Sequence, residues 1–297
     1  MATRVGLGLI EWPFSSAEGY WRWIDLCEEG GIDSIWQSDR LVSDTTALEC
    51  LSVMAALAGR TRRMKFGMSV LSLSWREPLV VAKACATIDY LSGGRLLPAF
   101  GLGSLKLPDW AALGLEPKGA GAAMDEALEF IIRLWRGETV DFEGVHIRAK
   151  GARISPLPVQ ADLPLWIGGS SPAAIRRTAR YGTGWMGGVE TPESAAETVA
   201  AIKAAASELG REIDPGHFGG GFFYRLAREG EAEPPALARP FGVASSVVIG
   251  DADAVLRHIR AYEAGGVTKL VLRPLARGDD DVLVQTRRLV EEVLPRV

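Results

Sequence analysis

The fold class of this chain is decided by residues 60–104, RTRRMKFGMSVLSLSWREPLVVAKACATIDYLSGGRLLPAFGLGS. A β-rich run, a helical run and a second β-rich run follow one another, and glycines and hydroxyls gather where each β-rich run stops. In parallel α/β proteins, ligands bind beyond the carboxyl ends of the strands. We therefore expect Ser69, Val70, Gly101, Gly103 and Ser104 to lie near a ligand.

The same alternation of short β-rich runs and longer amphipathic runs continues along the whole chain and predicts eight βα units. With 297 residues, we expect one domain, residues 1–297, folded as a (β/α)8 TIM barrel. The predicted strands are Val5–Ile10, Ile32–Gln37, Lys65–Leu71, Leu96–Gly101, Leu165–Gly168, Gly184–Gly187, Phe218–Tyr224 and Lys269–Arg273. The predicted helices are Gly19–Glu29, Thr45–Ala58, Leu79–Leu91, Met124–Trp135, Pro172–Tyr181, Glu193–Leu209, Asp253–Ala264 and Asp281–Val293. A doubly wound open sheet stays an alternative, although the first strand is not followed by the glycine fingerprint of a dinucleotide fold.

Two segments do not fit a plain βα repeat. After the fourth predicted helix, apolar residues on both sides of Glu143 and Gly144 indicate a β-hairpin insertion within residues 138–157, laid over the barrel. Residues 225–239 are rich in Glu, Ala and Pro without periodicity. They predict a mobile loop, for which a lid is one interpretation.

Composition excludes several classes of protein. The chain is 47% hydrophobic and 24% charged, with a formal net charge of -4, so no basic field invites nucleic acid. Apolar runs are too short for a membrane span or a secretory leader, and a cytoplasmic location is the default. The three cysteines are far apart in helical patterns, and the three histidines are scattered. We therefore predict neither a disulfide framework nor a metal site.

Two glycine-rich corners are suited to an anion. Gly101–Ser104 follows the fourth predicted strand, and Gly168–Pro172, which contains Gly169 and Ser170, opens the helix after the fifth. Glycine allows close approach of the backbone, and amides at a helix start point toward a bound anion. The sequence therefore predicts a phosphate cradle, with an ordinary tight βα loop as the alternative for each corner.

Polar residues also end the first two predicted strands. Period-2 alternation in the second strand places Asp39 at the barrel mouth, followed by Arg40. Glu11 and Trp12 end the first strand and are candidates for substrate contact. An ion pair that ties loops together is the structural alternative for Asp39. Lys106, Asp109 and Trp110 follow the fourth strand and are further candidates.

These motifs resemble the bacterial luciferase-like monooxygenase family of flavin- and deazaflavin-dependent oxidoreductases. Ser38-Asp39-Arg40 is similar to a Ser-Asp-His corner of its deazaflavin branch, with Arg40 where that His would stand. Arginine does not release its proton near neutral pH, so an acid role is replaced by anion binding or electrostatic stabilisation. Gly182-Thr183-Gly184-Trp185 resembles a Gly-Asp-Gly-Trp motif of the family, with Thr183 in place of Asp.

The resemblance implies where a cofactor would bind. In the family, a non-prolyl cis peptide at the position of Ser69-Val70 supports the ring, and the phosphate lies around strands four and five. This implies cofactor binding by Asp39, Ser69, Val70, Gly103, Ser104, Gly168, Gly169, Ser170 and Trp185. The catalytic candidates are Asp39, Arg40 and Glu11.

The resemblance also implies the reaction. Membership closer to the deazaflavin branch predicts hydride transfer between coenzyme F420 and a small organic substrate. An FMNH2-dependent monooxygenase is the first alternative, and a non-catalytic flavin-binding barrel is the second. The family also implies a homodimer formed through outer helices.

Overall fold

The computed structural model describes residues 3–10, 12–227 and 246–297. Parallel pairing joins the strands of its main sheet. The strands of the barrel are β1 (Arg4–Leu9), β2 (Ser34–Gln37), β3 (Lys65–Met68), β4 (Leu71–Ser72), β5 (Leu96–Leu97), β6 (Ala99–Gly101), β9 (Trp166–Gly168), β10 (Gly184–Met186), β11 (Phe218–Leu226) and β13 (Lys269–Pro274). A short strand, β12 (Val247–Gly250), pairs with the end of β11.

The sheet closes on itself between the third and fourth strand positions. β3 and β4 are two parts of the third predicted strand, and β5 and β6 are two parts of the fourth. The hydrogen-bonded order of strands begins with β4 and β6, continues around the ring and ends with β3 and β5. Because β4 continues β3 and β6 continues β5, the two ends of this order are the same pair of strand positions, and the sheet is closed. In the described part of the chain this gives eight strand positions, which confirms the barrel over the open sheet. The fourth strand is interrupted at Pro98 because proline has no N–H for the ladder.

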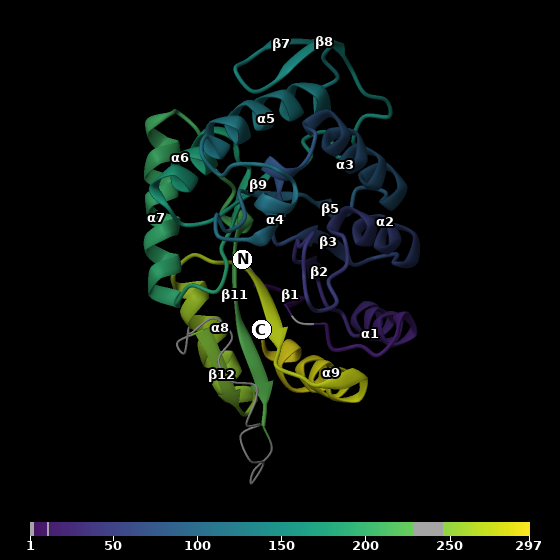
Figure 1. Cartoon of the computed structure of the whole chain (residues 1–297). Helices are drawn as coiled ribbons and strands as arrows, with labels where there is room; N and C mark the ends of the chain where they lie inside the picture. The colour runs from purple at the N-terminus through teal and green to yellow at the C-terminus, as the bar shows by residue number, and fades with distance from the viewer. Residues whose placement is uncertain (1–2, 11, 228–245) are drawn as a thin grey trace.

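Helices surround the strands in Figure 1. They are α1 (Ala17–Glu29), α2 (Cys50–Arg60), α3 (Pro78–Ser92), α4 (Pro108–Ala112), α5 (Ala120–Trp135), α6 (Pro172–Tyr181), α7 (Pro192–Glu208), α8 (Ala252–Ala264) and α9 (Gly278–Arg288). The predicted start of the second helix at Thr45 was wrong, and α2 begins at Cys50. Glu49 caps it there by accepting a hydrogen bond from the Ser52 amide at 2.7 Å. The short helix α4 was not predicted.

The barrel interior is filled by large side chains that lie opposite glycines. Trp36 and Trp166 are both about 1% exposed and belong to one buried cluster with Leu97, Ala99, Met186 and Val271. A Cβ atom at Gly67 would lie 2.7 Å from the Trp36 ring, and one at Gly184 would lie 2.8 Å from the Trp166 ring. These strands therefore require glycine so that the interior holds two indoles. The barrel is a packed core below its mouth.

The predicted hairpin is present but lies elsewhere than expected. β7 (Val140–Glu143) and β8 (Arg148–Ala152) pair antiparallel after α5, as predicted. In Figure 1 they lie on the far side of α5 from the strands of the barrel, and Phe142 packs edge-on against Phe130 of α5. The expectation that the hairpin covers the barrel is therefore wrong. The predicted loop 225–239 lies outside the described residues from 228 onward, and its first two residues complete β11.

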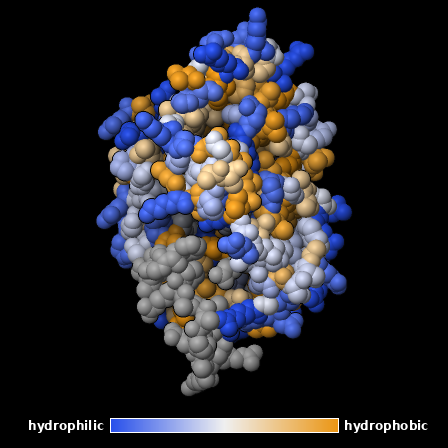
Figure 2. Space-filling model, in the orientation of Figure 1, coloured by the Kyte–Doolittle hydropathy of each residue, from blue (hydrophilic) through white to orange (hydrophobic). Residues whose placement is uncertain are grey.

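One face of the molecule carries exposed apolar residues. In Figure 2 apolar residues gather over the upper right of this face, where α3 lies in Figure 1. The exposed apolar side chains of α3 are Val80, Tyr90 and Leu91. No helix in the described ranges is both long and apolar enough to cross a bilayer.

Candidate active site

The carboxyl ends of the parallel strands meet at one end of the barrel, above the indole-filled interior. Val70 is partly exposed and packs on the interior cluster. Because all barrel strands run in the same direction, the residues that follow β2, β3, β6 and β9 reach this same end. The segments predicted to form the site are therefore brought together, and Val70 lies on the floor of the barrel mouth.

The Ser69-Val70 peptide bond is cis, at the position that the family resemblance implied. The Val70 side chain fits between two strand ends. A Cβ atom at Gly101 would lie 2.5 Å from Val70 Cγ2, and one at Gly168 would lie 2.7 Å from Val70 Cγ1. Gly101 and Gly168 therefore make room for the Val70 side chain. The sequence did not predict this role for the two glycines.

The two glycine corners are neighbours, because β6 and β9 pair through Ala99–Trp166 and Phe100–Ile167. Gly103 and Gly169 have φ angles of +68° and +98°, which favour glycine. Ser104, Gly169 and Ser170 are exposed. Ser171 caps α6 by accepting a hydrogen bond from the Ala174 amide at 3.2 Å, and Pro172 occupies the first turn. The start of α6 thus faces solvent beside the second corner, as an anion site requires.

Two indole N–H groups hold the backbone of the glycine corners in place. Trp110 Nε1 donates to the carbonyl of Ser104 at 3.2 Å, and Trp185 Nε1 donates to the carbonyl of Gly169 at 2.9 Å. Trp185 is fully buried, and it belongs to the core between strands and helices, not to the cluster that fills the barrel interior. Trp185, which the resemblance implies as a cofactor-binding residue, thus supports the Gly169 corner.

Asp39 is the centre of a buried ion-pair network. Its carboxylate accepts two hydrogen bonds from Arg76, at 2.7 and 2.8 Å, and one from the Ser72 amide at 2.9 Å. Arg76 also donates to Glu49 at 3.0 Å. Burial alone would lower the pKa of Arg76, but the two carboxylates raise it above its usual value. Asp39 therefore anchors the strand that follows the cis peptide, and its partner is Arg76, which the sequence did not single out.

Arg40, unlike Asp39, takes no part in the ion-pair network. It is half-buried and has no ion-pair or hydrogen-bond partner within the described ranges. The next residues are held by Asp109 of α4, whose Oδ1 accepts hydrogen bonds from the amides of Leu41 and Val42 at 2.8 and 3.3 Å. Asp109 is fully buried, and its Oδ2 has no partner in the described structure. Arg40 thus offers a free cation close to a fixed loop.

Arg273 is a site residue that sequence reasoning missed. It ends the lumen-facing row of β13, two residues after Val271. Its guanidinium donates to the Val271 carbonyl at 3.1 Å and to Ser69 Oγ at 3.3 Å. Burial lowers the pKa of Arg273 to about 10, although Glu190 and Tyr262 act in the opposite direction, so it stays a cation at neutral pH. The sequence feature that could have identified Arg273 is a charged residue near the carboxyl end of an otherwise apolar strand, on the face that points into the barrel.

The remaining candidates contribute less. Glu11 lies outside the described residues, and Trp12 follows it in the loop between β1 and α1. Lys106 is exposed. No cluster of three or more metal-ligating side chains occurs in the ranges that the structure describes.

Comparison with known proteins decides the family. Residues 5–233 match the family model described as luciferase-like monooxygenase. This chain belongs to that family. The match includes the Asp39 corner, the cis peptide and both glycine corners.

Among members of the luciferase-like monooxygenase family, the chain is 33% identical to an F420-dependent glucose-6-phosphate dehydrogenase of Nocardia farcinica over 201 residues. That alignment covers 64% of this chain and 59% of the relative, so the chain spans less than two thirds of that relative's length. Solved structures agree in fold. An F420-dependent secondary alcohol dehydrogenase with an F420-acetone adduct superposes with a TM-score of 0.84 and 18% identity, covering 99% of this chain and 98% of the other. The monooxygenase RslO1 of Streptomyces bottropensis gives 0.83 and 22%, covering 98% and 99%.

Proposed function

We propose that this chain, as a single luciferase-like domain, is an oxidoreductase that uses coenzyme F420 to transfer a hydride to or from a small organic molecule. One observation carries the proposal: the barrel mouth combines an exposed helix start, an apolar floor and a buried, unpaired cation. The similarity to an F420-dependent dehydrogenase and the fold shared with an F420-dependent alcohol dehydrogenase support it.

The residues at the mouth fit a phosphorylated, planar cofactor. The cofactor phosphate would bind at the two corners, to Gly103, Ser104, Gly168, Gly169 and Ser170. The ring would lie against Ser69 and Val70. The exposed corner residues and the start of α6 provide amide and hydroxyl donors for the phosphate. The partly exposed Val70 provides an apolar surface for the ring.

The deazaflavin supplies a hydride, because the carbon that replaces N5 of a flavin disfavours one-electron chemistry with oxygen. The chain supplies charge and position. We assign to Arg273 the stabilisation of negative charge on the substrate oxygen, since a buried cation acts strongly in a site shielded from water. Arg40 adds a second cation without a competing partner. Asp39 contributes by fixing Ser72 and Arg76 next to the cis peptide. Glu11 stays a proposed catalytic residue.

The proposal is tested by adding F420 and FMN separately to the purified protein and measuring binding by fluorescence. We expect F420 to bind, and its reduced form to persist in air-saturated buffer during stopped-flow mixing. Ser170→Asp places a negative charge at the cradle and should weaken binding at least tenfold. Ser207→Asp, on the exposed surface of α7, is the matched control and should leave binding unchanged.

The two alternatives give different results in the same experiment. Binding of FMN, with rapid oxygen-dependent decay of its reduced form and hydroxylation of product, would support an FMNH2-dependent monooxygenase. Cofactor binding without turnover of any alcohol or carbonyl compound would support a non-catalytic barrel.

We also propose a homodimer and a cytoplasmic location. Exposed apolar residues of α3, such as Leu91, offer a surface for a second copy. All three cysteines are buried free thiols, as is usual in a reducing compartment. Light scattering of the wild type and of Leu91→Lys tests the dimer, which should dissociate in the variant.

A further inference from the structure

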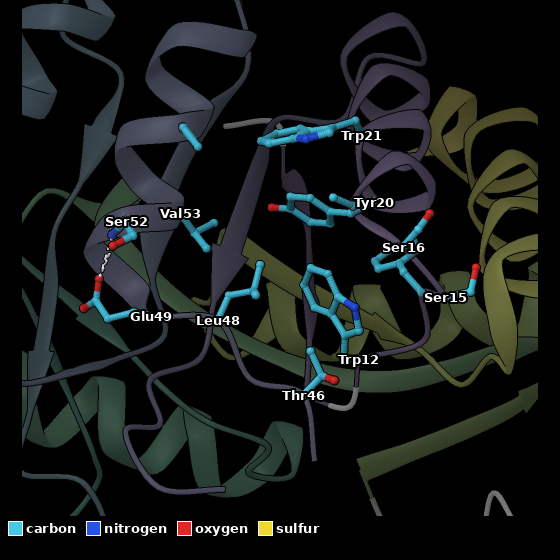
Figure 3. Close-up of a pocket in the computed structure, with 13 residues that line it drawn as sticks. Trp12, Ser15, Ser16, Tyr20, Trp21, Thr46, Leu48, Glu49, Ser52 and Val53 are labelled. Carbon is cyan, nitrogen blue, oxygen red and sulfur yellow. Dashed lines mark hydrogen bonds between the residues drawn. The ribbon is translucent and has the colours of Figure 1, made fainter. Parts of the chain in front are cut away.

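A cavity of about 500 Å³ lies outside the barrel, between the first turns of α1 and the amino-terminal half of α2. Figure 3 shows Trp12, Tyr20 and Trp21 on one side and Leu48 and Val53 on the other. The volume falls in the range of small-molecule sites, about 300 to 1,000 Å³. The cavity does not include any residue assigned to the cofactor.

Its aromatic wall is held in place by ring contacts. The centroids of Trp12 and Tyr20 are 4.9 Å apart, and those of Tyr20 and Trp21 are 5.0 Å apart. Phe14 packs edge-on against Trp12 at 5.1 Å. Tyr20 and Phe14 are buried, whereas Trp12 and Trp21 are partly exposed. The wall is therefore rigid and presents π faces, which accept a flat apolar ring or a cation.

The charge of the cavity differs from that of the barrel mouth. The lining contains no lysine, arginine or histidine, and its one acidic residue, Glu49, directs its carboxylate away from the aromatic rings toward Ser52 in Figure 3. Burial by itself raises the pKa of Glu49, but hydrogen bonds from the Ser52 amide and hydroxyl and from Arg76 lower it below its usual value. Glu49 is thus an anion at neutral pH. At the mouth, by contrast, Arg40 and Arg273 are cations that form no ion pair within 4 Å among the described residues, although Glu190 acts on Arg273 from a greater distance.

We propose that this cavity is a second binding site, for an organic molecule with a fused or substituted aromatic ring that is uncharged or cationic. The electron-rich rings, together with a lining that lacks lysine, arginine and histidine, favour such a ligand and disfavour an anion. The phosphorylated cofactor is therefore not its occupant. Hydrogen bonds link a lining residue to the mouth, because Glu49 shares Arg76 with Asp39, which in turn holds the Ser72 amide.

The proposal is tested with three probes that share one ring system: 1-naphthylmethylammonium, 2-naphthalenemethanol and 2-naphthoate. Binding to the full-length protein is measured by calorimetry and by quenching of tryptophan fluorescence. We expect the cation and the alcohol to bind, and the carboxylate to bind at least tenfold more weakly than the cation.

A pair of variants on α2 tests the location. Ala56 lines the cavity, whereas its neighbour Ala55 is also exposed and is not among the lining residues. Ala56→Trp should fill the cavity and weaken binding of the cationic probe at least tenfold, while Ala55→Trp should leave it unchanged.

Three results would overturn the proposal. The first is no binding of any probe at millimolar concentration, and the second is binding that Ala56→Trp does not affect. The third is a dimer that Ala56→Trp dissociates and Ala55→Trp does not, because a second copy of the chain would then cover the cavity. None of these results bears on F420 binding, so the proposed function is tested separately.

Discussion

Replacement of Arg76 measures how much the ion-pair network of Asp39, Arg76 and Glu49 contributes to the free energy of unfolding. The Asp39 side chain is fully buried and Arg76 is 12% exposed, and the two share bonds of 2.7 and 2.8 Å. Arg76→Met would leave the Asp39 carboxylate buried with only the Ser72 amide as a partner. Breaking a buried ion pair in this way costs about 3 to 5 kcal/mol. We therefore expect a loss of this size in the free energy of unfolding.

An exposed ion pair of the same chain provides the control. Arg60 donates to Asp25 at 3.0 Å, but their side chains are 49% and 43% exposed. Arg60→Met should leave the free energy of unfolding close to that of the wild type, because water screens the pair. Both variants are measured by urea unfolding at pH 7, followed by circular dichroism, with the slope against urea compared to the wild type.

A double variant separates the pair from its burial. The double variant Asp39→Asn, Arg76→Met removes both charges of the pair, so no buried carboxylate is left without its cation. It should therefore recover part of the stability lost in Arg76→Met. A loss below about 1 kcal/mol for Arg76→Met, or a loss equal to that of Arg60→Met, would refute the reasoning that burial sets the cost.

Three further predictions follow from the same region and from the barrel base. Gly168→Ala adds a Cβ atom 2.7 Å from Val70 Cγ1, so it should destabilise the fold by about 1 to 3 kcal/mol in urea unfolding. Trp185→Phe removes the donor to the Gly169 carbonyl, worth about 1 kcal/mol, and should weaken F420 binding about fivefold in a fluorescence titration. Burial lowers the pKa of Lys269 from 10.5 to about 8, in spite of its ion pair with Asp33. Between these values the unfolded chain binds more protons than the folded chain, so raising the pH should increase the free energy of unfolding relative to Lys269→Met.

Each of these has a contradicting outcome. Gly59 of α2 has no atom within 4 Å of a Cβ position, so Gly59→Ala should stabilise the chain by about 0.5 to 1 kcal/mol; equal effects at Gly59 and Gly168 would argue against the contact with Val70. Unchanged F420 affinity in Trp185→Phe would remove the support that we assign to this indole. A wild type and a Lys269→Met variant with parallel pH profiles from pH 8 to 10.5 would show that Lys269 keeps its usual pKa.

The order of elements could be read from the chain because local patterns encode it. Alternation between period-2 runs and amphipathic runs predicted the barrel, the hairpin and most helix bounds. Glycines beside hydroxyls marked the two corners. The resemblance to a known family located the cis peptide at Ser69-Val70, which no local pattern reveals.

The sequence by itself determined the barrel and the positions of its loops, because period, capping and turn chemistry act between residues close in the chain. Only the tertiary structure decided which side chains meet at the mouth. Arg76 pairs with Asp39 across 37 positions, and Arg273 reaches Ser69 across 204. The Trp185 side chain lies in the core between strands and helices, since its strand alternates and Met186 takes the inward position. Closure of the sheet sets these contacts, and a linear pattern carries no information about partners so distant.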